Sequence, residues 1–109
     1  MKINILGSEW TILFQTEEEE ARLKGKDGFC DVSTRTLVVE KNMQGELGDM
    51  DCYSRHVLRH EIVHAFLFEC GIWECSHSSG AWAQDEEMTD WIAHQGPKIY
   101  KAWQEAGAL

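Results

Sequence analysis

The chain has 109 residues, which is enough for one compact domain spanning residues 1–109, and its formal net charge is −9. An acidic surface disfavours nucleic acids and anionic membranes, and no segment approaches the ~18 consecutive apolar residues of a membrane span. We therefore expect neither a nucleic-acid nor a membrane partner. Residues 1–7 lack the pattern of a signal peptide, so the expected location is cytoplasmic.

The first forty residues predict a small, mainly antiparallel sheet. Residues 2–6 and 10–14 are rich in β-formers and flank the turn signal Gly7-Ser8, which predicts a β-hairpin. Residues 28–32 and 36–40 flank a second short turn and predict another hairpin. The segment between the two hairpins, residues 17–23, allows a short helical turn.

A long helix follows, with recognisable signals at both ends. Asp49 suits the N-cap, and Gly71 suits a left-handed residue after the last turn. About 20 residues between them include no glycine or proline, which corresponds to a helix of about 30 Å. The second half is apolar nearly all round, so most of its surface should be buried.

The remainder of the chain predicts a loop and further helix. Residues 72–80 have no periodicity and read as a loop that lies directly beyond the long helix. A second helix should begin near residues 79–82. Gly96-Pro97 interrupts it, so either one kinked helix or two consecutive helices would fit.

The long helix carries the motif H-E-x-x-H in His60-Glu61-Ile62-Val63-His64. Residues four apart share one helix face, so both imidazoles can reach one metal ion. Zn²⁺ held in this way keeps an open position, where a bound water becomes acidic. Glu61 lies beside the histidines, where it can act as the general base toward that water. The motif therefore predicts a catalytic zinc site, although core histidines that merely satisfy one another are the alternative.

A third protein ligand must come from elsewhere in the chain. His56 lies four residues before the motif, too far along the helix axis to share the ion with both motif histidines. Glu86 is the preferred third ligand, with Glu87 and then His77 as the alternatives. Asp90 follows Glu86 by one helical turn, so its carboxylate could accept the outer N–H of a ligating histidine.

Residues 55–71 and 84–93 together resemble the gluzincin class of zinc metallopeptidases. The small size of the chain is similar to that of short phage and prophage proteins grouped with the ImmA/IrrE-type peptidases or the minimal gluzincins. The resemblance implies a zincin-like α+β fold, in which the small sheet packs on the active-site helix and on a following glutamate helix. It implies Zn²⁺ as cofactor, with His60, His64 and Glu86 as ligands, Glu61 as the catalytic residue and Asp90 as support for a ligand histidine. It also implies a protein or peptide substrate that pairs with an edge strand, for which residues 36–40 are the candidate.

Several points depart from this pattern or stay open. Val63 stands where many relatives have glycine, and Tyr53, His77 and His94 are equal candidates for the residue that steadies the oxyanion. A catalytically weak or latent zinc-bound module of phage or prophage origin, which binds other proteins, is the leading alternative function. Zinc-dependent hydrolysis of a substrate other than a peptide is a further one.

Overall fold

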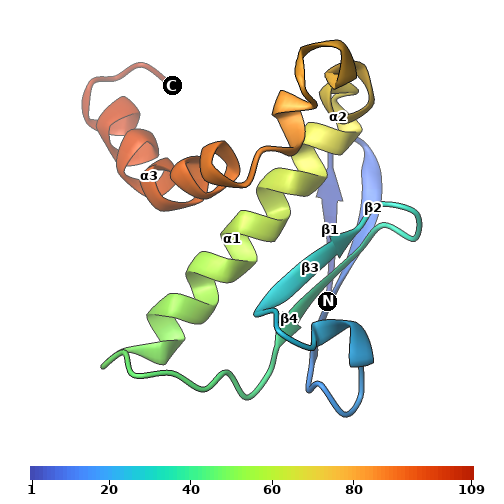
Figure 1. Ribbon diagram of the computed structural model, residues 1–109. Helices are drawn as coiled ribbons and strands as arrows, with labels where there is room; N and C mark the ends of the chain where they lie inside the picture. The colour runs from blue at the N-terminus through green and yellow to red at the C-terminus, as the bar shows by residue number, and fades with distance from the viewer.

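A long central helix contacts a four-stranded sheet on one side and a second long helix on the other (Figure 1). This computed structural model describes the backbone of residues 1–109 and the side chains of residues 1–78 and 80–109. The architecture is α+β, as predicted from the sequence. None of the helices in the described part of the chain is long and apolar enough to cross a membrane.

The sheet consists of β1 (Lys2–Ile5), β2 (Ser8–Gln15), β3 (Gly28–Asp31) and β4 (Thr36–Glu40), in the order β1-β2-β4-β3. Both predicted hairpins are present, since β1 pairs antiparallel with β2 and β3 pairs antiparallel with β4. The pairing of β2 with β4 is parallel, so the sheet is mixed. The prediction that residues 36–40 form an edge strand is wrong, because β4 lies between β2 and β3. The edge strand beside the central helix is β3.

Side chains alternate between the two faces of each strand, and the apolar ones on one face form the main core between the sheet and the central helix. Its buried members are Ile5, Trp10, Ile12, Leu37 and Ala65. Four of them come from the sheet, and Ala65 comes from the apolar second half of the helix. Burial of apolar surface at this contact fixes the face that the helix turns toward the sheet.

The central helix, α1, spans Met50–Glu69 and has the two predicted end signals. The side chain of Asp49 accepts a hydrogen bond of 2.8 Å from the backbone N–H of Cys52, and Gly71 has the left-handed φ of 88°. Its last residue, Glu69, accepts hydrogen bonds from Trp10 Nε1 at 2.8 Å and from Arg35 Nε at 2.6 Å. These contacts tie the C-terminal end of α1 to the sheet.

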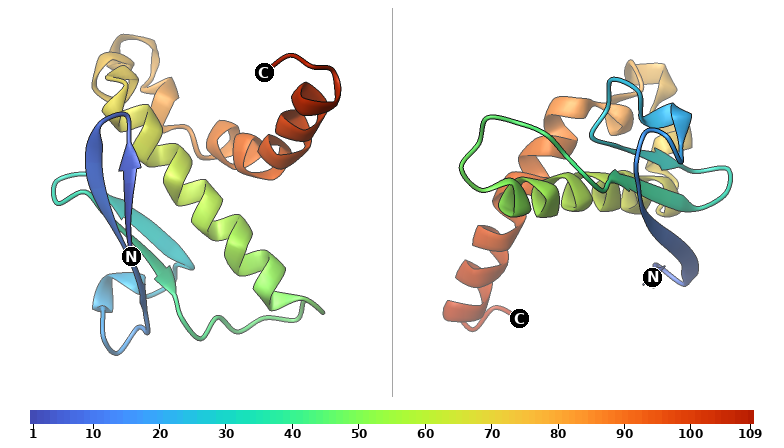
Figure 2. Two further views of the ribbon diagram at one scale, coloured as in Figure 1. Left: turned by 180° about the vertical axis from the view of Figure 1, so that it is seen from behind. Right: turned by 90° about the horizontal axis from the view of Figure 1, so that it is seen from below.

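The segment after α1 differs from the prediction in two respects. The expected loop contains a four-residue helix, α2 (Ile72–Cys75), and the second long helix, α3 (Glu86–Glu105), begins later than expected. Asp85 caps α3 by accepting a bond of 2.7 Å from the backbone N–H of Met88, which explains why the helix starts there. Pro97 lies inside one continuous helix. Figure 2 shows the second half of α3 extending away from the body, and residues 100–109 are all exposed.

Candidate metal centre

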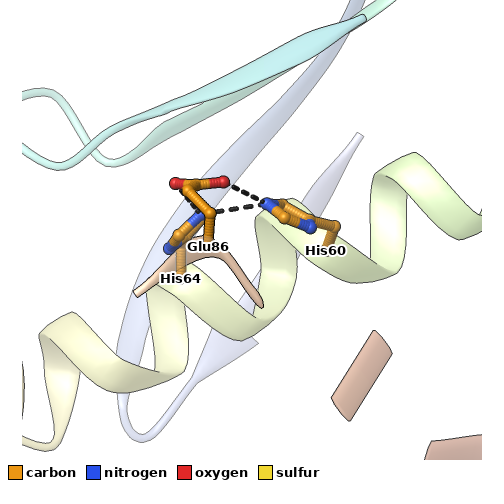
Figure 3. A group of neighbouring side chains, drawn as sticks. All are labelled: His60, His64 and Glu86. Atoms are coloured by element: carbon orange, nitrogen blue, oxygen red, sulfur yellow. Dashed lines mark hydrogen bonds and ion pairs between the residues drawn. The ribbon is translucent and has the colours of Figure 1, made fainter. Parts of the chain in front are cut away.

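The structure brings His60, His64 and Glu86 together at the contact between α1 and the start of α3 (Figure 3). One potential ligand atom from each side chain lies within 4.8 Å of the other two. The Nε2 atoms of the two histidines are 3.1 Å apart. The Glu86 carboxylate reaches both, with Oε2 at 3.0 Å from His60 Nε2 and Oε1 at 3.1 Å from His64 Nε2. Among the described side chains, this is the group that could hold a metal ion.

The chemistry of these atoms fits a cation at their centre. His60 Nδ1 lies 3.1 Å from Asp90 Oδ1, so a neutral His60 carries its proton on Nδ1 and presents a lone pair at Nε2. That lone pair faces the Glu86 carboxylate and His64 Nε2 at close range. Electron-rich atoms repel at this spacing unless a proton or a metal ion lies between them. Tetrahedral zinc with Zn–N bonds of about 2.0–2.1 Å would set its ligand atoms about 3.3 Å apart, close to the spacing found here.

Asp90 connects two histidines of α1. Besides His60 Nδ1, its Oδ1 atom contacts His56 Nε2 at 2.7 Å. The hydrogen bond with His56 is the leading cause that holds the pKa of Asp90 below its usual value, so the carboxylate stays ionised. An ionised Asp90 fixes the tautomer and the ring orientation of His60.

Glu61 is buried beside the ligand group. It is 6 % exposed, yet it lines two hollows of the surface, which are described below. Burial raises its pKa to about 7, because the charged carboxylate loses hydration. A carboxyl group that titrates near neutral pH can both accept and release a proton, which general acid–base chemistry requires.

His64 is the most enclosed of the three ligand candidates. It is 4 % exposed, and Trp73 of α2 packs edge-on against its ring with 5.7 Å between the ring centroids. Burial lowers the pKa of His64, which favours the neutral imidazole that a metal ion needs. Its buried Nδ1 atom has no hydrogen-bond partner among the described residues. The polar contacts of the ring are therefore those of Nε2, with His60 and Glu86.

The structure separates the alternative ligands from the centre. Glu87 lines a different depression with Trp91 and His94, and it does not belong to the ligand group. His77, in the short helical turn His77–Ser79, does not belong to that group either. Of the three candidates for the oxyanion-steadying residue, Tyr53 shares a hollow with Glu61, and its hydroxyl donates to Asp27.

Three further residues lie at the site, although the sequence alone did not assign them to it. His56 lies too far along the helix to be a ligand. Its i,i+4 spacing from His60 nevertheless places both rings against Asp90. Gly28 and Trp73 lie on β3 and α2, and no local pattern relates them to the motif. Their positions follow from the order of the strands and from the path of the chain after α1.

Comparison of the chain with known protein families, with curated proteins and with solved structures gave no match.

Proposed function

We propose that this protein is a zinc-dependent metallopeptidase of the gluzincin type. The observation that carries the proposal is the convergence of His60, His64 and Glu86 within 4.8 Å, next to the buried carboxyl group of Glu61. Two imidazoles and one carboxylate are the ligand set of catalytic zinc in the thermolysin type of site, and such a set leaves a coordination position open.

Each residue has a distinct role in the proposed reaction. His60, His64 and Glu86 would hold the ion, and Asp90 orients His60. Bound zinc supplies Lewis acidity, which makes water a stronger nucleophile and polarises a carbonyl. Glu61 accepts the proton of the attacking water and later gives it to the leaving amine.

The edge strand beside the ligands supports a peptide as the substrate. Over the described residues β3 pairs with β4 on one side only, so backbone groups on its other side remain available to an extended chain. Gly28, the first residue of β3, lines both hollows beside Glu61. An added strand gains main-chain hydrogen bonds with little dependence on sequence, a common mode of peptide recognition.

Metal analysis and a proteolysis assay test the proposal together. Protein purified without chelators should hold one zinc ion per chain and should cleave an unstructured protein substrate. Chelation should abolish the cleavage, and Glu61→Gln should abolish it without loss of zinc. A protein without zinc, whose melting temperature does not respond to added zinc, would refute the metal site. Zinc-loaded protein that leaves a broad peptide library uncut would refute the peptidase.

A zinc-bound module for protein interaction is the second candidate function. The observation that favours it is a set of large aromatic side chains on α3, where Trp91, Tyr100 and Trp103 are each more than half exposed. Tryptophan and tyrosine side chains are enriched at protein interfaces. Protein that binds zinc through the same residues but cleaves no peptide, with or without intact Glu61, would favour this function.

A further inference from the structure

Two hollows open on either side of Glu61, and both are bordered by Glu61 and by Gly28 of β3. The first, here called the Asp27 hollow, has a volume of about 250 Å³ and is also lined by Asp27, Tyr53, His56, Val57, His60 and Asp90. The second, the Trp73 hollow, has a volume of about 360 Å³ and is also lined by Lys26, Phe29, Cys30, His64, Trp73 and Glu86. Both volumes are several times the ~30 Å³ share of one water molecule, so each has room for an amino-acid side chain.

The two hollows differ in charge. The Asp27 hollow has the carboxylates of Asp27 and Asp90 on its wall, with no lysine or arginine among its lining residues. Asp27 is exposed, and the Asp90 side chain is 55 % exposed, so both can meet a ligand. The Trp73 hollow has the ammonium group of Lys26 on its wall, besides the carboxylate of the candidate ligand Glu86. Two consecutive residues of the chain thus place a carboxylate on the wall of one hollow and an ammonium group on the wall of the other.

The hollows also differ in the kinds of side chain that line them. Phe29 and Trp73 supply aromatic rings to the Trp73 hollow. Its cysteine, Cys30, has its pKa raised to about 12 by burial, so the side chain is a neutral thiol. The Trp73 hollow therefore suits a large apolar side chain, and the Asp27 hollow suits a cation.

The direction of β3 relates the hollows to the two sides of a scissile bond. A Cβ atom on Gly28 would lie 3.1 Å from Val57 and 3.4 Å from Glu61, whereas Cys30 shares the Trp73 hollow with His64, farther along α1. The strand and α1 therefore run in the same direction, as Figure 1 also shows. A peptide paired antiparallel to β3, the more stable pairing, would run in the opposite direction. Its residues before the scissile bond would meet the Trp73 hollow, and those after it would meet the Asp27 hollow.

Glu61 marks the point between the two hollows where the reacting bond belongs. It is 6 % exposed and lines both hollows, so its carboxyl group can be reached from either one.

We propose that the Asp27 hollow binds a lysine or arginine side chain directly after the scissile bond, while the Trp73 hollow binds a large apolar side chain before it. The inference rests on the proposed peptidase function and specifies its substrate class. Asp27 and Lys26 determine the preference, because they carry opposite charges on the two sides of Glu61.

Matched peptides test this preference. The first has Phe-Lys at its centre, the second has Phe-Glu, and the third has the composition of the first with the lysine moved three residues away. Zinc-loaded protein should cleave the first at the Phe-Lys bond with a kcat/KM roughly tenfold above that of the others, as expected for attraction to two partly exposed carboxylates. Equal rates on all three, or a basic preference before the cleaved bond, would overturn the inference.

A charge swap within the protein provides the sharper test. The double variant Lys26→Asp with Asp27→Lys keeps the net charge and should abolish the preference for Phe-Lys, because the new ammonium group at position 27 offsets the Asp90 carboxylate that remains on the wall of the hollow. The matched control is the charge swap Lys101→Glu with Glu105→Lys on α3, which also keeps the net charge, lies at exposed residues that line neither hollow, and should retain the preference for Phe-Lys. A swapped variant with the wild-type preference would assign the selectivity to other residues and overturn the role of Asp27.

Binding to an inactive variant separates this inference from the proposed function. Zinc-loaded Glu61→Gln is tested by fluorescence anisotropy with labelled Phe-Lys and Phe-Glu peptides. If the wild type cleaves nothing while this variant prefers Phe-Lys roughly tenfold, the peptidase proposal fails and the charge assignment of the hollow stands. If the wild type cleaves peptides without regard to charge, the function stands and the inference fails.

Discussion

Without metal, the Glu61→Gln variant should gain stability relative to the wild type as the pH rises above the ordinary pKa of a glutamate. Burial raises the pKa of the Glu61 carboxyl from 4.5 to about 7. Between these values the folded protein holds a proton that the unfolded chain has released, so the folded state loses stability as the pH rises. The loss is complete above about pH 7 and amounts to about 3 kcal/mol at about pH 8, against under ~0.5 kcal/mol at about pH 4.5. Glutamine stays neutral throughout and avoids this loss.

Urea unfolding of both proteins with a chelator, at about pH 4.5 and about pH 8, measures the effect. The difference in unfolding free energy between variant and wild type should move by about 3 kcal/mol in favour of the glutamine variant as the pH rises. A buried amide can cost ~1–3 kcal/mol if unsatisfied, but that cost is the same at both pH values and cancels. The titration of His64 occurs in both proteins and largely cancels too. An unfolding difference that does not change with pH would show that Glu61 is hydrated and would remove the basis for its pKa near 7.

Three further outcomes are expected. Zinc at about 100 times its dissociation constant should raise the unfolding free energy by about 2.7 kcal/mol, and His64→Ala should eliminate the increase, as thermal melts with and without zinc can show. Asp90→Asn should weaken zinc binding by about 10- to 100-fold in a competition titration, since His60 loses the carboxylate that orients it; unchanged affinity would argue against this role. Gly28→Ala should destabilise the fold by about 1–3 kcal/mol in urea unfolding, because its Cβ would lie 2.8 Å from the carbonyl oxygen of Val38; a neutral effect would mean that β3 shifts freely.

Local spacing in the sequence predicted much of the candidate site. The i,i+4 relation places His60 and His64 on one helix face and Glu86 and Asp90 on another, whatever the rest of the fold. The hairpins were equally local, since each joins neighbouring segments through a short turn. The cap at Asp49 and the left-handed Gly71 also depend on nearby residues only.

Features that depend on strand order could not be read from the sequence in the same way. The second hairpin can join β2 through either of its strands, and β-rich composition does not distinguish these arrangements. The structure joins it through β4, in a parallel pairing that leaves β3 at the edge. Consequently the strand beside Glu61 is the one that begins with Gly28, which permits the close approach to α1 that a larger residue would prevent.

The two halves of the candidate metal centre are held in different ways. His60 and His64 are fixed by α1, whose C-terminal end is anchored to the sheet through Glu69. Glu86 is largely exposed, and its position depends on how the first half of α3 docks on α1. That docking includes a hydrogen bond of 2.8 Å from Arg59 Nε to the carbonyl oxygen of Ala93. A cation bound by all three ligands would join α1 and α3 directly, so metal affinity and the docking of α3 are coupled. Arg59 lies next to the motif and contributes no ligand atom, but its hydrogen bond to Ala93 holds the helix that carries Glu86 and so supports the candidate metal centre.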